Sequence, residues 1–259
     1  MIPLVDMHCH LLPGLDDGPR GEADALRMCR LAYDEGVRIS VALAHQNERW
    51  KANTPDVLRQ AAQHLTQRLH QEGIALTVCP GAEVMVQPAF ELSLSKGEYL
   101  SVADRGQYLL LEFPHGLFVD LRPLVECLRL RGLHPILAHP ERTPELLHDT
   151  EQIEQLIRLG CLVQVSSGSV TAPQSRDRRA LKKWFQRDIV HLLGSDGHSP
   201  TRRPPRMADA YHQIASWTTS ATADRVCSTN GMAICHGLPL RISEPLPRPR
   251  RRFLNLRLW

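Results

Sequence analysis

The segment that decides the fold is an apolar run ending in two histidines, Leu4-Val5-Asp6-Met7-His8-Cys9-His10. Its short apolar pattern predicts a β-strand. Alternate residues of a strand share one face, so the imidazoles of His8 and His10 point the same way and can bind one metal ion. A histidine pair at a strand end also occurs in proteins without metal. The residues at the ends of the other strands therefore decide whether this pair is interpreted as a metal ligand.

Six further strands are expected, and amphipathic helical segments separate most of them. The predicted strands span residues 4–10, 37–45, 74–78, 108–113, 133–139, 161–166 and 189–195. The predicted helices span residues 22–35, 55–73, 120–131, 151–159, 176–187, 206–217 and 222–228, with Thr54 as the N-cap of the second. This alternation predicts one parallel α/β domain over residues 1–240.

Histidine, glutamate or aspartate stands at the carboxyl end of six of these seven strands. The segments are His8-Cys9-His10, Ala44-His45, Pro80-Gly81-Ala82-Glu83, Glu112-Phe113-Pro114, Ala138-His139-Pro140-Glu141-Arg142 and Ser195-Asp196-Gly197-His198. In a parallel barrel these ends converge on one mouth, where active sites form. An open sheet would spread them along a line. The constellation therefore predicts a closed or nearly closed barrel with a metal site in its mouth.

Each of these residues has an ordinary explanation when it is taken singly. A lone histidine such as His45 is more often packed or exposed than a metal ligand. A structural ion pair can satisfy Glu83 or Glu112, because an unpaired carboxylate beside an apolar strand is costly to bury. Only their shared placement favours metal binding.

Composition narrows the class of protein. The 259 residues are 42% hydrophobic and 23% charged, as in an ordinary soluble globular chain. No apolar run approaches the roughly 20 residues of a membrane-spanning helix, and the first residues do not resemble a signal peptide, so no stable membrane insertion is expected. The seven cysteines include no Cys-x-x-Cys pair, which favours a reducing cytoplasm over a disulfide framework.

The positive charge is concentrated near the carboxyl terminus. The formal net charge is +3, and four arginines lie within residues 248–252. The rest of the chain is near neutral, so no nucleic-acid surface is expected. Residues 241–259 are predicted to be a basic, flexible tail, with docking on acidic lipid or a partner as the alternative.

With these motifs in view, the chain resembles the polymerase-and-histidinol-phosphatase (PHP) superfamily. Within it, the chain is most similar to the bacterial protein-tyrosine phosphatases encoded with capsule and exopolysaccharide assembly systems. The resemblance rests on residues 8–18 (HCHLLPGLDDG), 80–83 (PGAE), 111–114 (LEFP), 138–142 (AHPER), 195–198 (SDGH) and 203–205 (RPP). It spans about residues 1–237 and implies a distorted seven-stranded, TIM-like barrel.

The resemblance also implies three metal sites and their ligands. One ion would be held by His8, His10, Glu83 and Asp196, a second by Glu83, Glu112 and His139, and a third by Asp17, His45 and His198. Nitrogen and oxygen ligands without thiolate favour Mn²⁺, Fe or Zn²⁺, and the resemblance points to Mn²⁺.

Three further positions bear on this comparison. Arg142 and Arg203 match arginines that bind the phosphate group, which suits the planar fork of donors on a guanidinium. Gln46 departs from the pattern, because many relatives carry a second histidine there. We expect this change to alter the rim of the pocket without removing a ligand.

The implied reaction is hydrolysis of phosphotyrosine by water that the metal ions activate. The implied partner is a capsule-type tyrosine autokinase with a tyrosine-rich tail. The oligomeric state is not predicted. One alternative keeps the metals and changes the substrate to a small phosphate monoester, such as histidinol phosphate, or to a nucleotide. Another is a non-catalytic regulatory protein on the same barrel, which would be expected to lack some of the ligands.

A second phosphatase motif is set aside. Cys235 and Arg241 have the Cys-x5-Arg spacing of cysteine-dependent tyrosine phosphatases. That loop needs several backbone N–H groups and a thiol with a lowered pKa. Pro239 removes one N–H group, and bulky leucines replace small residues. The sequence therefore predicts that Cys235 is not a nucleophile.

Overall fold

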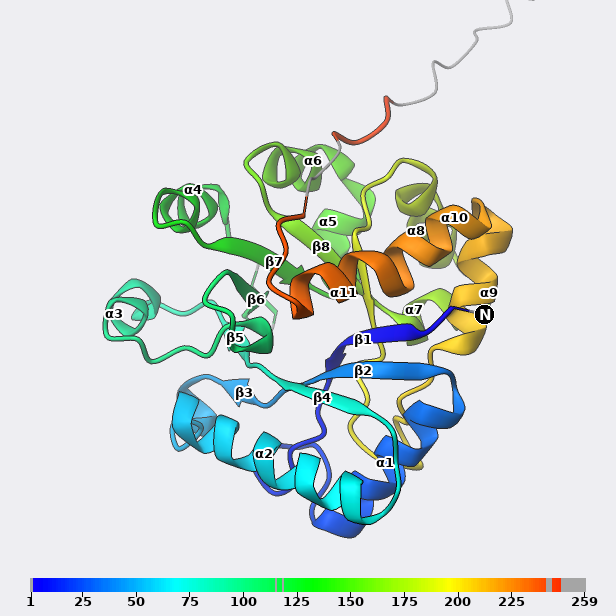
Figure 1. Ribbon diagram of the computed structural model, residues 1–259. Helices are drawn as coiled ribbons and strands as arrows, with labels where there is room; N and C mark the ends of the chain where they lie inside the picture. Colours follow the sequence, from blue (N-terminus) through cyan, green and yellow to red (C-terminus); the bar gives the residue numbers. More distant parts are fainter. Residues whose placement is uncertain (1, 115, 118, 241–243, 248–259) are drawn as a thin grey trace, which may run out of the picture.

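Parallel strands and helices alternate along the chain in the computed structural model, which describes residues 2–114, 116–117, 119–240 and 244–247 (Figure 1). The strands are β1 (Leu4–Cys9), β2 (Val37–Ala42), β3 (His45–Gln46), β4 (Thr77–Pro80), β5 (Glu83–Met85), β6 (Tyr108–Glu112), β7 (His134–Ala138), β8 (Leu162–Ser166) and β9 (Leu192–Gly194). All ladders between these described strands are parallel. The predicted parallel α/β class is confirmed.

The helices follow most of the predicted boundaries. They are α1 (Glu22–Asp34), α2 (Pro55–Gln71), α3 (Phe90–Ser95), α4 (Arg122–Leu130), α5 (Pro144–His148), α6 (Thr150–Arg158), α7 (Ser167–Thr171), α8 (Arg176–Gln186), α9 (Ala208–Trp217), α10 (Ser220–Asp224) and α11 (Asn230–Cys235). Thr54 caps α2, and its side chain accepts a hydrogen bond from the Val57 N–H. Gly36 and Gly160 adopt positive φ angles of 92° and 97° just before β2 and β8, a conformation that favours glycine.

Several helices differ from the prediction because they are too short to show a helical period. Helices α3, α5 and α7 have five or six residues each and were not predicted. The helix expected at residues 222–228 is part of a longer run, in which a π-helical turn (Arg225–Thr229) joins α10 to α11.

The strands form two sheets. One has the order β1-β2-β4 and the other β3-β5-β6-β7-β8-β9. The strand predicted at residues 37–45 is divided into β2 and β3, and the strand predicted at 74–78 begins later, as β4, and is followed by β5. A Cβ atom on Gly81 would lie 2.9 Å from side-chain atoms of Val41 and Leu43, so the chain passes its neighbour closely where it bends. No ladder among the described residues closes these strands into one sheet.

Backbone hydrogen bonds nevertheless join the carboxyl ends of β1 and β9. The Asp196 N–H donates to the His8 carbonyl at 2.6 Å, and the His10 N–H donates to the Gly197 carbonyl at 2.9 Å. These bonds hold His8 at the end of β1, and His10 just after it, beside the loop that follows β9.

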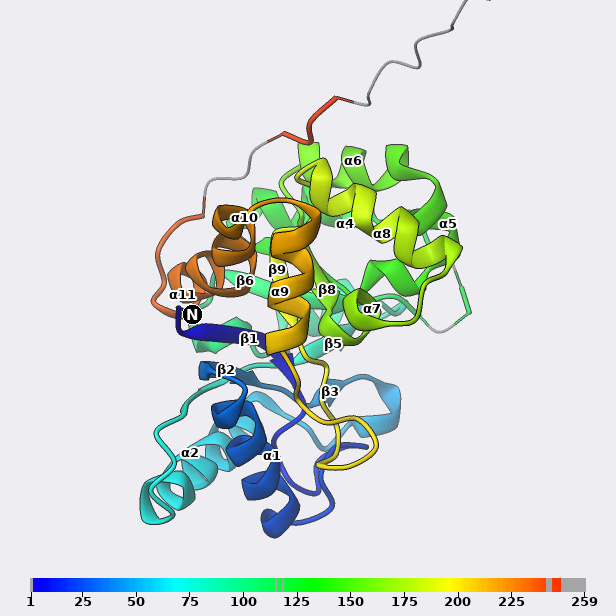
Figure 2. The same cartoon turned by 90° about the vertical axis from the view of Figure 1, so that its right-hand side faces the viewer.

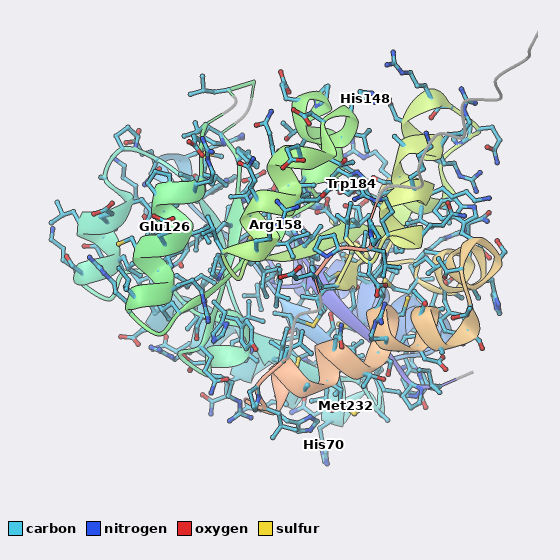
Figure 3. The ribbon with its side chains drawn as sticks, turned by 90° about the horizontal axis from the view of Figure 1, so that it is seen from above. His70, Glu126, His148, Arg158, Trp184 and Met232 are labelled. Atoms are coloured by element: carbon cyan, nitrogen blue, oxygen red, sulfur yellow. The ribbon has the colours of Figure 1, made fainter. Side chains whose placement is uncertain are left out.

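Apolar side chains cover both faces of the strands. Leu109 and Leu111 pack with the larger cluster, which includes Trp184 of α8, whereas Leu110 packs with a second cluster. Trp184 and Met232 are labelled in Figure 3. Met232 of α11 lies against that second cluster. Helices α7, α8 and α9 pack together along the side where β8 and β9 lie (Figure 2). No described helix is both long and apolar enough to cross a membrane.

The predicted basic tail lies largely outside the described residues. Of residues 241–259, the structure describes 244–247, and the arginines at 248–252 are not among them. Within this short piece, the Leu246 N–H donates to the Arg187 carbonyl at 2.9 Å, and the Arg187 Nε donates to the Leu246 carbonyl at 3.1 Å.

The close approach of β9 to β1 generates a stability prediction. A Cβ atom on Gly194 would lie 2.9 Å from the backbone nitrogen of His8 and 2.8 Å from Gln164 Nε2. Overpacking of this kind costs about 1–3 kcal/mol, so Gly194→Ala is expected to lower the free energy of unfolding by that amount. Urea denaturation measures the change. Gly168→Ala in α7 is the control, because its added Cβ meets nothing within 4 Å, and equal midpoints for the two variants would contradict the prediction.

Candidate metal centre

The structure brings all nine predicted ligands together at the carboxyl ends of the strands. They come from the end of β1 and the loop after it, from β3, β5 and β6, and from the loops after β7 and β9. Four sets have potential ligand atoms within 4.8 Å of one another: His10, Asp17, His45 and His198; His8, Glu83 and His139; His8, His10 and Asp196; and His45, Glu83 and Glu112. Residues up to 190 positions apart therefore share one polar site, as the strand-end pattern predicts.

Glu83 lies at the centre of this cluster and is 1% exposed. Its Oε2 atom is 3.3 Å from His8 Nε2, 3.2 Å from His10 Nε2 and 3.2 Å from His45 Nδ1. Its Oε1 atom is 2.8 Å from Nε2 of His139. A carboxylate with histidines against both oxygens is well placed to bridge two cations.

Asp17 lies at the more exposed edge of the cluster. Its Oδ1 atom is 3.4 Å from His45 Nε2 and 3.6 Å from His198 Nε2. Its side chain is 55% exposed, whereas the two histidines are nearly buried. His10 also belongs to this set, which differs from the division that the resemblance implies, because there His10 belongs only to the first ion.

The electrostatics of the cluster suit cation binding. Burial, together with the negative charge of Glu83, raises the pKa of Glu112 to about 8. Burial opposes ionisation of Glu83 too, but the charge of His8 and hydrogen bonds from His10 and His139 hold the pKa of Glu83 well below its usual value. Three buried carboxylates, Glu83, Glu112 and Asp196, thus converge on one space, where like charges are costly unless cations balance them.

The imidazoles of His45, His139 and His198 are held in the neutral form that metal coordination requires. Burial lowers the pKa of His45 and of His139. Burial, followed by the positive charge of His10, lowers the pKa of His198 to about 3. The Nδ1 atom of His45 is buried and makes no hydrogen bond among the described residues. This donor set of neutral imidazoles and carboxylates fits Mn²⁺, Fe or Zn²⁺.

Two other side chains orient His8 of β1 and His10 just after it, and the sequence analysis did not identify these two side chains. Asp16 Oδ2 lies 2.6 Å from His10 Nδ1, and Gln164 Oε1 lies 2.9 Å from His8 Nδ1. Such contacts fix the ring orientation and the tautomer of a ligating histidine. The signal for Gln164 was available, because it is a polar residue in the middle of an otherwise apolar strand. Asp16 also accepts a hydrogen bond from the His45 N–H at 3.0 Å.

Gln46 has a structural role away from the cluster. Its Nε2 donates to the carbonyls of Asn53 at 2.7 Å and of Glu98 at 3.0 Å, and its Oε1 accepts from the Leu100 N–H at 2.8 Å. His45, the preceding residue, is the one that faces the cluster. The departure at Gln46 therefore takes no side chain away from the nine, and Gln46 lines a separate cavity beside β3.

Arg142 and Arg203 converge on Asp196 from two different loops. Both guanidinium groups donate to Asp196 Oδ2, and Arg142 also donates to Ser166 Oγ at 2.9 Å. Burial and the nearby charge of Arg142 lower the pKa of Arg203 to about 10. The two side chains remain 42% and 39% exposed, so both can reach an anion that approaches the cluster.

The backbone is unusual at two of the ligand positions. His139 and Asp196 directly follow or nearly follow β7 and β9, and they have positive φ angles of 34° and 54°. Residues other than glycine rarely adopt this conformation, and such strain gathers at functional sites. It turns both side chains toward the cluster at the point where each strand ends.

Cys235 lies elsewhere. It ends α11, is 4% exposed and packs in the second apolar cluster. A hydrogen bond with Cys79, together with burial, raises its pKa, which is the opposite of what a nucleophilic thiol needs. Arg241, the other residue of the motif, lies outside the described residues.

Comparison with known proteins points to one family. The family that matches is described as "Capsular polysaccharide synthesis, CpsB/CapC", over residues 4–236. The tyrosine-protein phosphatase YwqE of Bacillus subtilis is 34% identical over 209 residues, which cover 77% of this chain and 79% of the relative. The tyrosine-protein phosphatase CpsB of Streptococcus pneumoniae is 26% identical over 219 residues, covering 82% and 90%.

The fold of this chain is similar to that of several solved structures. A crystal structure from a study of YwqE and CpsB, which describes them as unique metal-dependent tyrosine phosphatases, has a TM-score of 0.87 and 29% identity, covering 95% of this chain and all of that one. Dihydropyrimidinase from Brevibacillus agri has a TM-score of 0.55 at 12% identity, covering 95% of this chain and 73% of that one. The second likeness concerns the fold alone.

The protonation states predict how metal binding depends on pH. The charge of Asp16 and its hydrogen bond outweigh burial and raise the pKa of His10 to about 10, while the pKa of Glu112 is about 8. Without metal, both His10 and Glu112 are protonated at pH 7, and a metal ion that binds them must displace a proton from each. We expect Mn²⁺ binding to release one or two protons, so its affinity should rise roughly 10- to 100-fold per pH unit between pH 6 and 7.5.

Titration calorimetry in two buffers of different ionisation heat measures the number of protons released. An affinity for Mn²⁺ that is the same at pH 6 and pH 7.5 would rule out these protonation states.

Proposed function

Since this chain belongs to the CpsB/CapC family of capsular polysaccharide synthesis, we propose that it is a metal-dependent protein-tyrosine phosphatase. The observation that carries the proposal is the cluster of nine histidines and carboxylates with Arg142 and Arg203 at its edge. Cations beside arginine forks form a site for a phosphate group and for the water that attacks it.

The nine residues would hold up to three divalent ions, with Mn²⁺ the expected metal. His8, His10 and Asp196 would bind one ion, His139 and Glu112 would bind a second, and Glu83 would bridge them. Asp17, His45 and His198 would bind the third, with His10 near enough to share it. When bound, such ions stabilise negative charge on phosphoryl oxygens and lower the pKa of water.

The arginines would bind the phosphoryl oxygens. Arg142 and Arg203 share one carboxylate oxygen of Asp196, so each keeps other N–H donors for a ligand. Their positive charges would stabilise the charge that develops on the equatorial oxygens during hydrolysis.

The leaving group would take its proton from water. His45 and His198 would be metal ligands, and burial lowers the pKa of both, to about 3 for His198, so neither would be a positively charged imidazolium near pH 7. A tyrosine phenolate has a pKa near 10 and leaves with little assistance.

A cavity beside the cluster, lined by both polar and apolar side chains, supports an aromatic substrate. It has a volume of about 480 Å³, and its lining includes Asp17, His45, Trp50, Met85 and Pro114. The aromatic and apolar side chains in this lining would pack against the ring of phosphotyrosine while the phosphate reaches the metal ions. A small polar monoester such as histidinol phosphate would leave this surface unfilled.

The physiological substrate and the cellular compartment are proposed from the family membership as well. The substrate would be phosphotyrosine on a tyrosine autokinase of capsule or exopolysaccharide synthesis, whose tail can reach a site at strand ends. The described cysteines are all free thiols, which supports a reducing cytoplasm. A catalytic domain at residues 1–240 is supported by the family match over residues 4–236.

We also propose that the strands act as one distorted seven-stranded barrel. In this interpretation, β2 and β3 together form one bent strand of the barrel, and β4 and β5 together form another. Hydrogen bonds across the bends support it, from the Gly81 N–H to the Ala42 carbonyl and from the Glu83 N–H to the Ala44 carbonyl, each 3.1 Å long. The bonds between the ends of β1 and β9 would complete the ring.

A substrate panel tests the activity. The metal content of purified protein is measured first, and hydrolysis of a phosphotyrosine peptide, a phosphoserine peptide and histidinol phosphate is then followed. We expect phosphotyrosine to be hydrolysed with the highest kcat/KM, chelation to abolish turnover, and Mn²⁺ to restore it. Full activity of metal-free protein, or a preference for histidinol phosphate, would refute the proposal.

Replacement of Arg142 tests the phosphate-binding role. Arg142→Ala is expected to lower kcat/KM about 100-fold, as loss of one stabilising donor does elsewhere, while the metal content stays the same. Arg131→Ala is the matched control, because Arg131 is exposed and precedes β7 at the opposite end of the strands. Unchanged kinetics in Arg142→Ala would exclude the role.

A further inference from the structure

A second cavity begins at the two arginines that touch Asp196. It has a volume of about 640 Å³, and its lining comes from the loop after β7, from β8 and α7, from residues 202–206 and from the start of α9. This space is much larger than one phosphate group requires, and ligand sites commonly have such volumes. The side of the cluster marked by Arg142 and Arg203 therefore has room for more of a substrate than its phosphate.

The charge of this lining is strongly positive. It contains Arg142, Arg202, Arg203 and Arg206 but only one acidic residue, Asp209. Arg142 and Arg203 pair with Asp196. In contrast, the guanidinium groups of Arg202 and Arg206 have no hydrogen-bond or ion-pair partner among the described residues, and both residues are exposed. Two arginines are thus available to an anion beyond the phosphate.

The backbone that carries these arginines is well anchored. Ser199 Oγ accepts hydrogen bonds from the backbone N–H groups of Arg202 and Arg203, each at 3.0 Å. Ser167 Oγ donates to the carbonyl of Arg206 at 2.6 Å. Glu35 then accepts from the backbone just beyond, at residues 207 and 208. A fixed backbone lowers the entropy that an arginine loses when it binds a ligand.

We propose that this cavity binds carboxylate side chains next to the phosphotyrosine, so that the preferred substrates are acidic phosphotyrosine peptides. The inference rests on the proposed phosphatase function and adds the class of peptide. Arginine forks suit carboxylates, and a positive cavity attracts acidic segments before contact. An extended peptide advances about 3.3 Å per residue, so acidic residues two to four positions from phosphotyrosine lie roughly 7–13 Å along the chain.

The test compares three peptides that share one phosphotyrosine and differ only at the flanking positions, which carry glutamate, glutamine or lysine. We expect kcat/KM for the glutamate peptide to exceed that for the glutamine peptide by roughly 3- to 10-fold, because exposed ion pairs each contribute modestly. Salt at 0.5 M should reduce this preference, because it screens exposed charges.

Variants locate the preference. The double substitution Arg202→Gln with Arg206→Gln should reduce the ratio between glutamate and glutamine peptides to near one. Arg202→Glu with Arg206→Glu should reverse the preference toward the lysine peptide. The control pair is Arg131→Gln with Lys183→Gln, which removes the same charge at the amino ends of β7 and β9 and should keep the native ratio.

The outcomes separate this inference from the function on which it rests. Equal hydrolysis of all three peptides by the native protein would overturn it and leave the phosphatase proposal intact. A preference that survives in Arg202→Gln with Arg206→Gln would also overturn it. If no phosphotyrosine peptide is hydrolysed by the metal-loaded protein, the proposed function itself is wrong.

Discussion

The site depends on the contacts that one buried carboxylate, that of Glu83, makes with the surrounding histidines. Histidines from three other parts of the fold meet it: His8 in β1 with His10 just after it, His45 in β3 and His139 after β7. Burying an ionised carboxylate is costly unless positive groups surround it. The strands must therefore bring their carboxyl ends together before this charge is stabilised. Cation binding and folding stabilise the same arrangement, so each favours the other.

The side chains around the cluster differ from one side to the other, and this difference would orient a bound substrate. Near Asp17 and His45 the lining includes Trp50 and several apolar side chains, whereas near Arg142 and Arg203 it is basic. A molecule with an aromatic ring, a phosphate and acidic neighbours is complementary to all three regions. These surfaces support the proposal that acidic phosphotyrosine peptides are the preferred substrates.

Local irregularities of the fold are concentrated around the site. β2 ends and β3 begins where His45 must turn inward, and His139 and Asp196 adopt left-handed backbone conformations after their strands. Gln164 places a polar group in the middle of a buried strand and holds His8. Regular strands would have paired more completely but would have directed these side chains elsewhere. Natural proteins commonly give up local regularity at functional sites in this way.

The sequence by itself determined the class of fold and the eight members of the cluster at strand ends, and the family resemblance supplied the ninth, Asp17. Apolar runs, the Thr54 cap and glycines such as Gly36 are local signals, and strand ends that carry His, Asp or Glu are visible without coordinates. Only the tertiary structure decided the division into two sheets, the short helices, the roles of Gln164 and Gln46, and the basic cavity at Arg202 and Arg206. These features arise from contacts between residues distant in sequence, and a local pattern carries no record of such contacts.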